Sequence, residues 1–396
     1  QQKDSKQKKI VQIEDLSVSF DGMEVVKHVN IEVNSGEIVG IVGESGSGKS
    51  ITSLTLMGLL SKQAQVTSGK IIVDGEVLRE ADRPFDERLY RRFQGSRMSM
   101  IFQEPMTSLN PTKKAGVQVD EIVRLHTDLE KEKRYEKVLE TFQAVGLKDA
   151  KKVYDSYPHQ LSGGMRQRVM IAMAVILHPD LIIADEPTTA LDVTIQTQIV
   201  ELLKDINKSE QNAMLFITHD LNLARRICHK VVVMKDGVVQ QVDTPQALYN
   251  TPCNLFVAGF IGSLQMNFMD AKCTIKGNDV TLTVGKHVLK VPASKKQALI
   301  DGGYDGKTVI LGIRPEDVHD SQAFISNSPD SVIESTIKVY ELLGAEVFLY
   351  FDVNGTQITA RVDPGTKAKT GDPVKFDFDM EKTHFFDKDS ELVITN

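Results

Sequence analysis

The chain of 396 residues is 41% apolar and 26% charged, and its formal net charge is −7. This length allows two or three domains, and the acidic balance argues against nucleic acid as a partner. No apolar run approaches the ~18 residues of a membrane-spanning helix, and three cysteines without metal-like spacing suit a reducing compartment.

Residues 1–9 are polar and basic, and we expect them to be flexible. Residues 10–33 hold two strand-like runs on either side of the turn Asp21-Gly22. Phe20 ends the first run, shortly before a glycine-rich stretch. Its ring could stack on an adenine base or could be an ordinary core residue of the strand. The sequence leaves both interpretations open.

The glycine-rich stretch matches G-x-x-x-x-G-K-[ST] without a mismatch. An apolar strand over 38–42 precedes it and a helix follows, so backbone N–H groups and the positive end of the helix should cradle a polyphosphate. Lys49 should reach the β- and γ-phosphates, and the Ser50 hydroxyl should bind Mg²⁺. The residues expected to bind nucleotide here are Gly43, Glu44, Ser45, Gly46, Ser47, Gly48, Lys49 and Ser50.

Charge and the spacing of apolar residues predict the elements of residues 80–176. Residues 80–97 are strongly charged, which is typical of a surface segment, and an apolar strand over 98–102 ends at Gln103. Residues 120–145 have helical spacing. Ser162 is a plausible N-cap for a helix over 165–176.

Two more apolar strands stop at polar residues, one at Asp185-Glu186 and one at His219. Strands that alternate with helices and end in polar side chains predict a mostly parallel sheet with its site at the carboxyl ends of the strands. Asp185 should hold Mg²⁺, and Glu186 should accept a proton from the attacking water, a role worth roughly 10²–10⁴ in rate. Gln103 could contact both Mg²⁺ and the water, and His219 could contact the γ-phosphate.

The pattern of apolar residues changes after about residue 260, where helical patterns vanish and short strand-like runs alternate with turns. Asn354-Gly355 is a strong hairpin signal. Many short strands separated by turns predict a small β-barrel or a pair of them. We therefore expect a cassette domain over 10–245 with a helical insert at about 104–165, a linker over 246–263, and a β-barrel domain over 264–396.

Together with the motifs below, these features make the chain resemble the ATPases of the ATP-binding-cassette (ABC) family. Leu161-Ser162-Gly163-Gly164-Met165-Arg166-Gln167-Arg168 is similar to the family signature, although Gln is commonest at position 165. Asp185-Glu186-Pro187, Ala190-Leu191-Asp192 and Thr218-His219-Asp220 match the remaining motifs in order. The resemblance implies ATP and Mg²⁺ as ligands and two cassettes that sandwich two ATPs. It further implies that Ser162, Gly163 and Gly164 of one subunit contact the γ-phosphate on the other, with Asp192 also at the nucleotide.

The two halves resemble different subfamilies. The cassette resembles the ATPases of oligopeptide, dipeptide and nickel importers in residues 103–111, 161–168 and 185–193. The C-terminal part is similar to multiple-sugar and maltose-type ATPases in residues 256–263, 266–268 and 311–317. This second resemblance implies that 264–396 is a regulatory domain built from oligonucleotide-fold (TOBE-type) barrels, although it could instead only enlarge the dimer interface. In this family a membrane subunit inserts a short helix into a groove near the insert, here about 103–161, which favours peptide import.

The resemblance implies several partners and one location. The partners are a second ABC ATPase subunit, integral membrane permease subunits and, indirectly, an extracellular solute-binding protein. The location is the cytoplasmic face of a bacterial membrane. Carbohydrate import, a soluble non-transport ABC ATPase, an exporter and a nucleotide sensor without turnover remain alternatives. The pair Glu186 and His219 argues against the sensor.

Overall fold

The computed structural model describes residues 7–396, except for the side chains of residues 105 and 106. Most of the segment expected to be flexible, residues 1–6, lies outside the described residues, and Lys9 already belongs to the first strand. The chain divides into two compact units, Gln1–Pro245 and Gln246–Asn396. Each unit is built around its own hydrophobic core.

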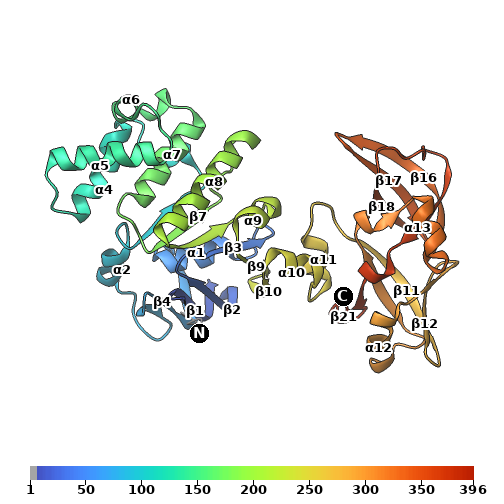
Figure 1. Cartoon of the computed structure of the whole chain (residues 1–396). Helices are drawn as coiled ribbons and strands as arrows, with labels where there is room; N and C mark the ends of the chain where they lie inside the picture. The colour runs from blue at the N-terminus through green and yellow to red at the C-terminus, as the bar shows by residue number, and fades with distance from the viewer. Residues whose placement is uncertain (1–6) are drawn as a thin grey trace, which may run out of the picture. The chain divides into compact units, whose positions relative to one another are not determined.

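The first unit contains an antiparallel and a mainly parallel sheet (Figure 1). The antiparallel sheet has the order β2-β1-β4-β5, with β1 (Lys9–Phe20), β2 (Met23–Asn34), β4 (Ala64–Val73) and β5 (Glu76–Glu80). The second sheet has the order β10-β9-β3-β8-β7-β6, with β3 (Ile38–Gly43), β6 (Met98–Ile101), β7 (Leu181–Asp185), β8 (Ala213–Ile217), β9 (Lys230–Lys235) and β10 (Val238–Asp243).

The central strands of the second sheet are continuous apolar runs. Every residue of β3 and β8 is buried, because parallel strands in the middle of such a sheet are covered on both faces. Only β10, which pairs antiparallel with β9, departs from the parallel arrangement. The predicted mostly parallel sheet is therefore present in the described part of the chain.

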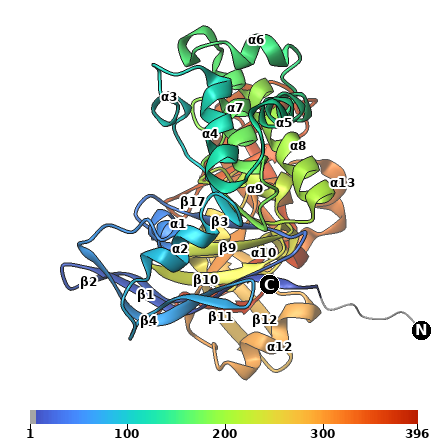
Figure 2. The ribbon, with the colours of Figure 1, turned by 90° about the vertical axis from the view of Figure 1, so that its left-hand side faces the viewer.

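Nine helices complete the described part of this unit. They are α1 (Lys49–Met57), α2 (Glu87–Phe93), α3 (Pro105–Ser108), α4 (Ala115–His126), α5 (Lys131–Ala144), α6 (Ala150–Tyr154), α7 (Gly163–Val175), α8 (Val193–Glu210) and α9 (Leu221–Ile227). A short 3-10 turn, Pro158–Gln160, precedes α7. Figures 1 and 2 show α4, α5 and α6 grouped away from the antiparallel sheet, so the insert forms a layer of its own.

One helical prediction in this unit needs correction, and one helix was not predicted. The charged segment 80–97 lies largely at the surface, as predicted, and it contains the unpredicted helix α2. Tyr90 and Phe93 of this helix are buried, and Leu89 packs against the first core. The single helical pattern over 120–145 is interrupted, since α4 ends before Thr127 and α5 begins after Glu130. No glycine or proline marks this break in the sequence.

The second unit is rich in β-structure, as predicted. Its six-stranded sheet has the order β13-β12-β11-β14-β20-β21, with β11 (Asn267–Lys276), β12 (Asp279–Val284), β13 (His287–Lys290), β14 (Thr308–Ile313), β20 (His384–Asp387) and β21 (Val393–Thr395). Its five-stranded sheet has the order β15-β19-β16-β17-β18, with β15 (Val318–His319), β16 (Val332–Leu343), β17 (Glu346–Val353), β18 (Thr356–Val362) and β19 (Pro373–Phe378).

The second unit also contains helices that the sequence did not predict. The expected linker over 246–263 forms most of α10 (Pro245–Asn250) and all of α11 (Leu255–Phe260). The expectation that helical patterns vanish was wrong, because α12 (Ala293–Asp301) and α13 (Gln322–Asn327) are present. α12 buries only Lys295 and Leu299, and α13 buries no residue, so neither has a clear apolar stripe.

Candidate functional site

The parallel register brings the strand ends of the second sheet to one edge. Ile101 on β6 pairs with Ala184 on β7, and Asp185 pairs with Ile217 on β8. Ile217 also pairs with Ile41 on β3. The carboxyl ends of parallel strands are the usual ligand site of such sheets. The residues that leave the sheet at this edge are Gln103, Glu186, His219 and the loop 44–48.

The loop after β3 requires glycine at three positions for two reasons. A Cβ atom at Gly43 would lie 2.4 Å from the Met234 carbonyl oxygen, so no larger residue fits there. Gly46 and Gly48 have φ of +79° and +96°, which side-chain-bearing residues rarely adopt. Gly48 is also the N-cap of α1, so the loop leads directly into the positive end of a nine-residue helix.

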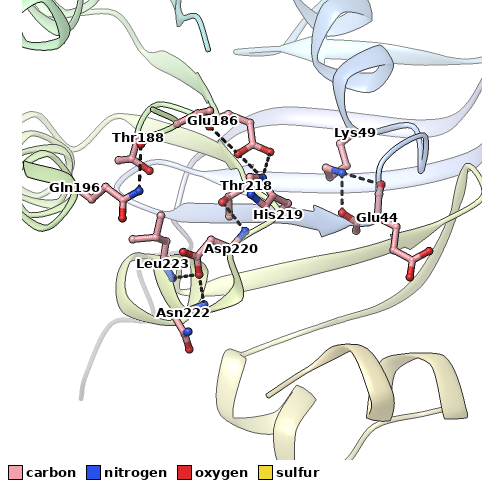
Figure 3. Close-up of polar contacts among 12 residues, drawn as sticks. Glu44, Lys49, Glu186, Thr188, Gln196, Thr218, His219, Asp220, Asn222 and Leu223 are labelled. Carbon is pink, nitrogen blue, oxygen red and sulfur yellow. Dashed lines mark hydrogen bonds and ion pairs between the residues drawn. The ribbon is translucent and has the colours of Figure 1, made fainter. Parts of the chain in front are cut away.

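Lys49 folds back over this loop. Its Nζ donates hydrogen bonds to the carbonyl oxygens of Gly43 at 2.8 Å and Glu44 at 3.0 Å, and to Ser47 Oγ at 3.4 Å (Figure 3). Burial lowers the pKa of Lys49, and the nearby carboxylates of Glu186 and Asp185 oppose that shift. The ammonium group is thus held at the loop, and Glu44, Ser45 and Ser50 are exposed beside it.

Asp185 has the features of a metal ligand. Its Oδ1 is buried and has no hydrogen-bond partner among the described residues. Burial raises the pKa of Asp185 to about 6, and the charge of Glu186 adds to the shift while Lys49 opposes it. A cation would supply the missing partner for this oxygen.

The chemistry of the donors fits Mg²⁺ in particular. Mg²⁺ is usually held by one or two carboxylates together with water and substrate phosphates. No group of three or more His, Cys, Asp or Glu able to hold a metal occurs in the described ranges. The residues that would complete the set are the exposed Ser50 and Gln103, and Gln103 lies two positions beyond the end of β6.

Glu186 and His219 are in direct contact (Figure 3). Nδ1 of His219 lies 3.0 Å from Oε1 and 2.9 Å from Oε2 of Glu186. The Glu186 side chain is 13% exposed and the His219 side chain 70% exposed, so the carboxylate is sheltered while the imidazole faces solvent. Because Nδ1 carries the proton that it donates to Glu186, Nε2 remains available for a ligand.

A capped turn holds His219 in place. Asp220 donates its N–H to Thr218 Oγ1 at 2.9 Å, and its carboxylate accepts from the N–H groups of Asn222 at 2.8 Å and Leu223 at 3.3 Å. Asp220 is therefore the N-cap of α9. Sequence reasoning assigned no role to Thr218 or Asp220, although an aspartate before an apolar helix is a capping signal.

Ser162 is the N-cap of α7, and the first turn of this helix, residues 162–165, is partly exposed to solvent. We call it the open turn. Its Oγ accepts from the Met165 N–H at 3.3 Å, and both Ser162 and Gly163 are exposed. Among the described residues outside its own stretch of helix, the nearest atom to a Cβ at Gly163 would be Leu191 Cδ2 at 3.7 Å, whereas a Cβ at Gly164 would lie 3.0 Å from Ile195 Cγ2. None of the hydrogen bonds among the described residues joins this turn to the loop 44–48.

Asp192 and Phe20 lie outside the cluster of contacts around Lys49 and Glu186. Asp192 is exposed and caps α8 by accepting the Ile195 N–H at 2.9 Å. Phe20 is half-buried at the end of β1, where it pairs with Met23 and Ala64 and packs against the first core. This packing agrees with the core interpretation and still leaves part of the ring accessible.

Comparison with protein-family models divides the chain in three. Residues 26–189 match the ABC transporter model, residues 262–318 the MalK OB fold domain and residues 327–385 the TOBE domain. These matches confirm the predicted fold class, a P-loop cassette followed by an oligonucleotide-fold, TOBE-containing region.

Curated relatives cover the cassette part of the chain. The dipeptide transport ATP-binding protein DppD of Escherichia coli is 42% identical over 259 residues, which span 64% of this chain and 78% of that protein. The oligopeptide transport ATP-binding protein AppD of Bacillus subtilis is 44% identical over 257 residues, or 64% and 77% of the two chains.

Solved structures give the same result for the fold. The ATP-binding cassette MJ0796 in a post-hydrolysis dimeric state, bound to ADP and Pi, superposes with a TM-score of 0.52 at 29% identity, covering 59% of this chain and 98% of that one. CbiO1 of Clostridium perfringens, part of the ABC transporter complex cbiONQ, has a TM-score of 0.54 at 25% identity, covering 61% and 90%.

No helix in residues 7–396 has the length and apolarity to cross a bilayer. The loop at Lys49, the strand-end acids and the open turn at Ser162 lie on a cassette fold that relatives share over most of their own length. The chain belongs to the ATP-binding proteins of ABC transporters, whose members hydrolyse ATP.

Proposed function

We propose that this chain is the ATP-hydrolysing subunit of an importer of short peptides. The observation that carries the substrate class is the 42–44% identity to dipeptide and oligopeptide transport ATP-binding proteins over the cassette. The cassette, and not the second unit, contains the surface expected to meet the membrane subunits. Peptide import is therefore favoured over import of other solutes.

ATP is bound and hydrolysed at the carboxyl edge of the second sheet. The N–H groups of the loop 44–48 and the Lys49 ammonium hold the phosphates, and Phe20 is the proposed stacking partner of the adenine. Mg²⁺, held by Ser50, Asp185 and Gln103, would neutralise charge that develops on the phosphate oxygens.

The hydrolytic step is assigned to Glu186 and His219. The oxygen of a water attacks the γ-phosphorus, the bond from that phosphorus to the bridging oxygen of ADP breaks, and Glu186 accepts the proton that the water loses. His219 is proposed to donate a hydrogen bond from Nε2 to the γ-phosphate while Nδ1 holds Glu186 in place. Gln103 is proposed to orient the water and to respond when phosphate leaves.

A second cassette is proposed to complete each site. ABC cassettes dimerise, and a neighbour in structure is itself a dimer. Ser162, Gly163 and Gly164 present N–H groups at the start of a 13-residue helix, and Gly163 has free space above it. This open turn is suited to the γ-phosphate on the partner cassette, with Asp192 at the same junction.

The helical insert is proposed to bind the permease. ABC cassettes work with membrane permeases, and α4 leaves two apolar side chains in water within the 104–165 segment. Val117 is 42% and Leu125 is 69% exposed, and they are eight positions apart on the same face of the helix. A short apolar helix of a permease would cover them. This arrangement would place the chain at the cytoplasmic face of the membrane, served by an extracellular solute-binding protein.

Sugar import is the second candidate. The match of residues 262–318 to the MalK OB fold domain favours it. The test is ATPase activity of the complex that co-purifies with the tagged chain, reconstituted in vesicles with a peptide-binding or a sugar-binding protein. We expect stimulation by di- and oligopeptides. Stimulation by oligosaccharides alone would contradict peptide import, and co-purification without any membrane subunit would contradict a transport role.

A further inference from the structure

Gln167 is a buried side chain without a partner. Its exposed fraction is 0%, and neither the nitrogen nor the oxygen of its amide has a hydrogen-bond partner among the described residues. Burying an unpaired donor and acceptor costs free energy, whereas leucine or methionine would fill the same space without that cost. The amide therefore needs an explanation beyond packing in this conformation.

The position of Gln167 links two motifs of the cassette. Gly163 and Gly164 lie four and three residues before it on α7, so all three share one face of the helix. Side chains on a helix lean towards its N-terminus, so Gln167 covers the turn that contains these glycines. The Cβ positions of Gly163 and Gly164 lie 3.7 Å from Leu191 and 3.0 Å from Ile195. Leu191, just before α8, and Ile195, in its first turn, therefore lie against this face of α7. Figure 1 shows the two helices next to each other.

The segment before α8 is held in a strained conformation. Glu186 and Ala190 have φ of 47° and 66°, in the left-handed region that non-glycine residues rarely occupy. Its turns are closed by Thr189 N–H to Glu186 at 3.1 Å and by Leu191 N–H to Thr188 at 3.3 Å. Strain of this kind is concentrated at active sites, ligand clamps and switch regions. A rearrangement that opens the longer bond would release the N–H of Leu191, a residue whose side chain lies beside Gly163 of α7. The carbonyl oxygen of Thr188 would still accept from Gln196 Nε2 at 3.2 Å, and Gln167 would have to share or replace that bond.

We propose that Gln167 is a positioning residue that bonds the main chain of residues 188–192 in the ATP-loaded form. The new bonds would tie the open turn of α7, which faces the partner's nucleotide, to the segment that follows Glu186. The amide is unpaired in the arrangement described here because its partners are still engaged in their own turns. This inference rests on the proposed function, since it requires two cassettes to close on ATP.

The chain contains a matched control in Gln118 on α4. This glutamine is also buried, but its Oε1 accepts from Asn110 N–H at 2.8 Å, and its Nε2 donates to the carbonyl oxygens of Asn110 and Lys113, both at 2.9 Å. Gln167→Leu and Gln118→Leu are the same chemical change in a buried glutamine of the same unit. They differ in whether the amide is bonded in the form without nucleotide.

The experiment uses the full chain with Glu186→Gln, which should trap ATP. Thermal unfolding without nucleotide, binding of a fluorescent ATP analogue to the monomer, and dimerisation with Mg-ATP by light scattering are measured for each variant. We expect Gln118→Leu to lower the Tm, and Gln167→Leu to leave it unchanged or raise it. Gln167→Leu should leave binding to the monomer unchanged and weaken dimerisation by about tenfold for each protomer. Gln167→Met is the second variant if the leucine variant does not fold.

Each outcome bears on the proposal. A Tm that falls as far as in Gln118→Leu, with dimerisation unchanged, would mean that the amide is already satisfied, for example by buried water, and would overturn it. Unchanged Tm with unchanged dimerisation would also overturn it. A parent chain that does not dimerise with ATP would instead count against the proposed function. The two failures are therefore distinguishable.

Discussion

Nδ1 of His219 lies 2.9 Å from a carboxylate oxygen of Glu186, although 33 positions separate the two residues in the chain. The contact joins the ends of β7 and β8, which are neighbours in the sheet. It links the residue proposed to accept the proton of water to the residue proposed to bind the γ-phosphate. The two side chains should therefore act as one unit in hydrolysis.

Replacing Glu186 with glutamine should keep ATP binding and remove nearly all turnover. The amide has the shape of the carboxylate but cannot accept a proton, so we expect a loss of about 10²–10⁴ in kcat. Phosphate release and binding of a fluorescent ATP analogue measure the two effects. Glu201→Gln, which changes an acid on α8 that pairs with Arg226 and Lys204, is the control. Normal turnover in Glu186→Gln would contradict the assignment of Glu186 as the general base.

Loss of His219 should not add to loss of Glu186. His219→Ala alone should lower kcat by about 10²-fold, because the γ-phosphate loses a donor and Glu186 loses its orienting contact. In a chain that already carries Glu186→Gln, the same change should have little further effect, as expected for residues that act together. A fully multiplicative loss in the double variant would show that the two residues act independently. Because the imidazole is 70% exposed, the Tm should not change.

Gly163→Ala should separate folding from hydrolysis. The added Cβ would have 3.7 Å to its nearest neighbour, and alanine is a better helix former than glycine, so the Tm should stay the same or rise slightly. In a dimer the methyl group would stand between the N–H groups of this turn and the partner's γ-phosphate. We expect at least a tenfold loss of kcat with unchanged binding of ATP to the monomer. Wild-type turnover would mean that this turn does not cover a nucleotide.

His384 should make the second unit sensitive to acid. Burial lowers the pKa of this histidine from 6.5 to about 4, and Arg314 and Lys295 add to the shift while the bond to Asn396 opposes it. Because the folded pKa lies below the unfolded one, the contribution to stability is complete above about pH 6.5 and is lost as the pH falls towards 4. His384→Gln should therefore lose less stability than the parent chain between about pH 7 and about pH 5. Calorimetric unfolding curves with equal pH dependence for the two chains would contradict this.

The parts of the fold that the sequence predicted are those with strong local signals. The strands β3, β7 and β8 are short apolar runs, and each is buried over almost its whole length. Glycine at 46 and 48 is required by the local backbone conformation, with φ of +79° and +96°. Such features depend on the chain nearby, so they could be identified before any packing was known.

The missed helices have weak local signals. α2 buries only Tyr90 and Phe93, with Leu89 partly buried against the first core. α12 buries only Lys295 and Leu299, with Ile300 partly buried against the second. Two buried positions in seven to nine residues do not produce a clear period of 3.6. The break between α4 and α5 has no glycine or proline, so only the packing of the insert reveals it.

By itself the sequence determined which chemical groups are available and in what order: a phosphate loop ending in Lys49 and Ser50, acids after one apolar strand, and a histidine after another. It did so because each motif is contiguous. Only the tertiary structure decided which groups meet. The register of β7 with β8 places Glu186 against His219, and the packing of α7 leaves the amide of Gln167 buried and unpaired. Contacts between distant residues depend on strand register and helix packing, and no local pattern encodes them.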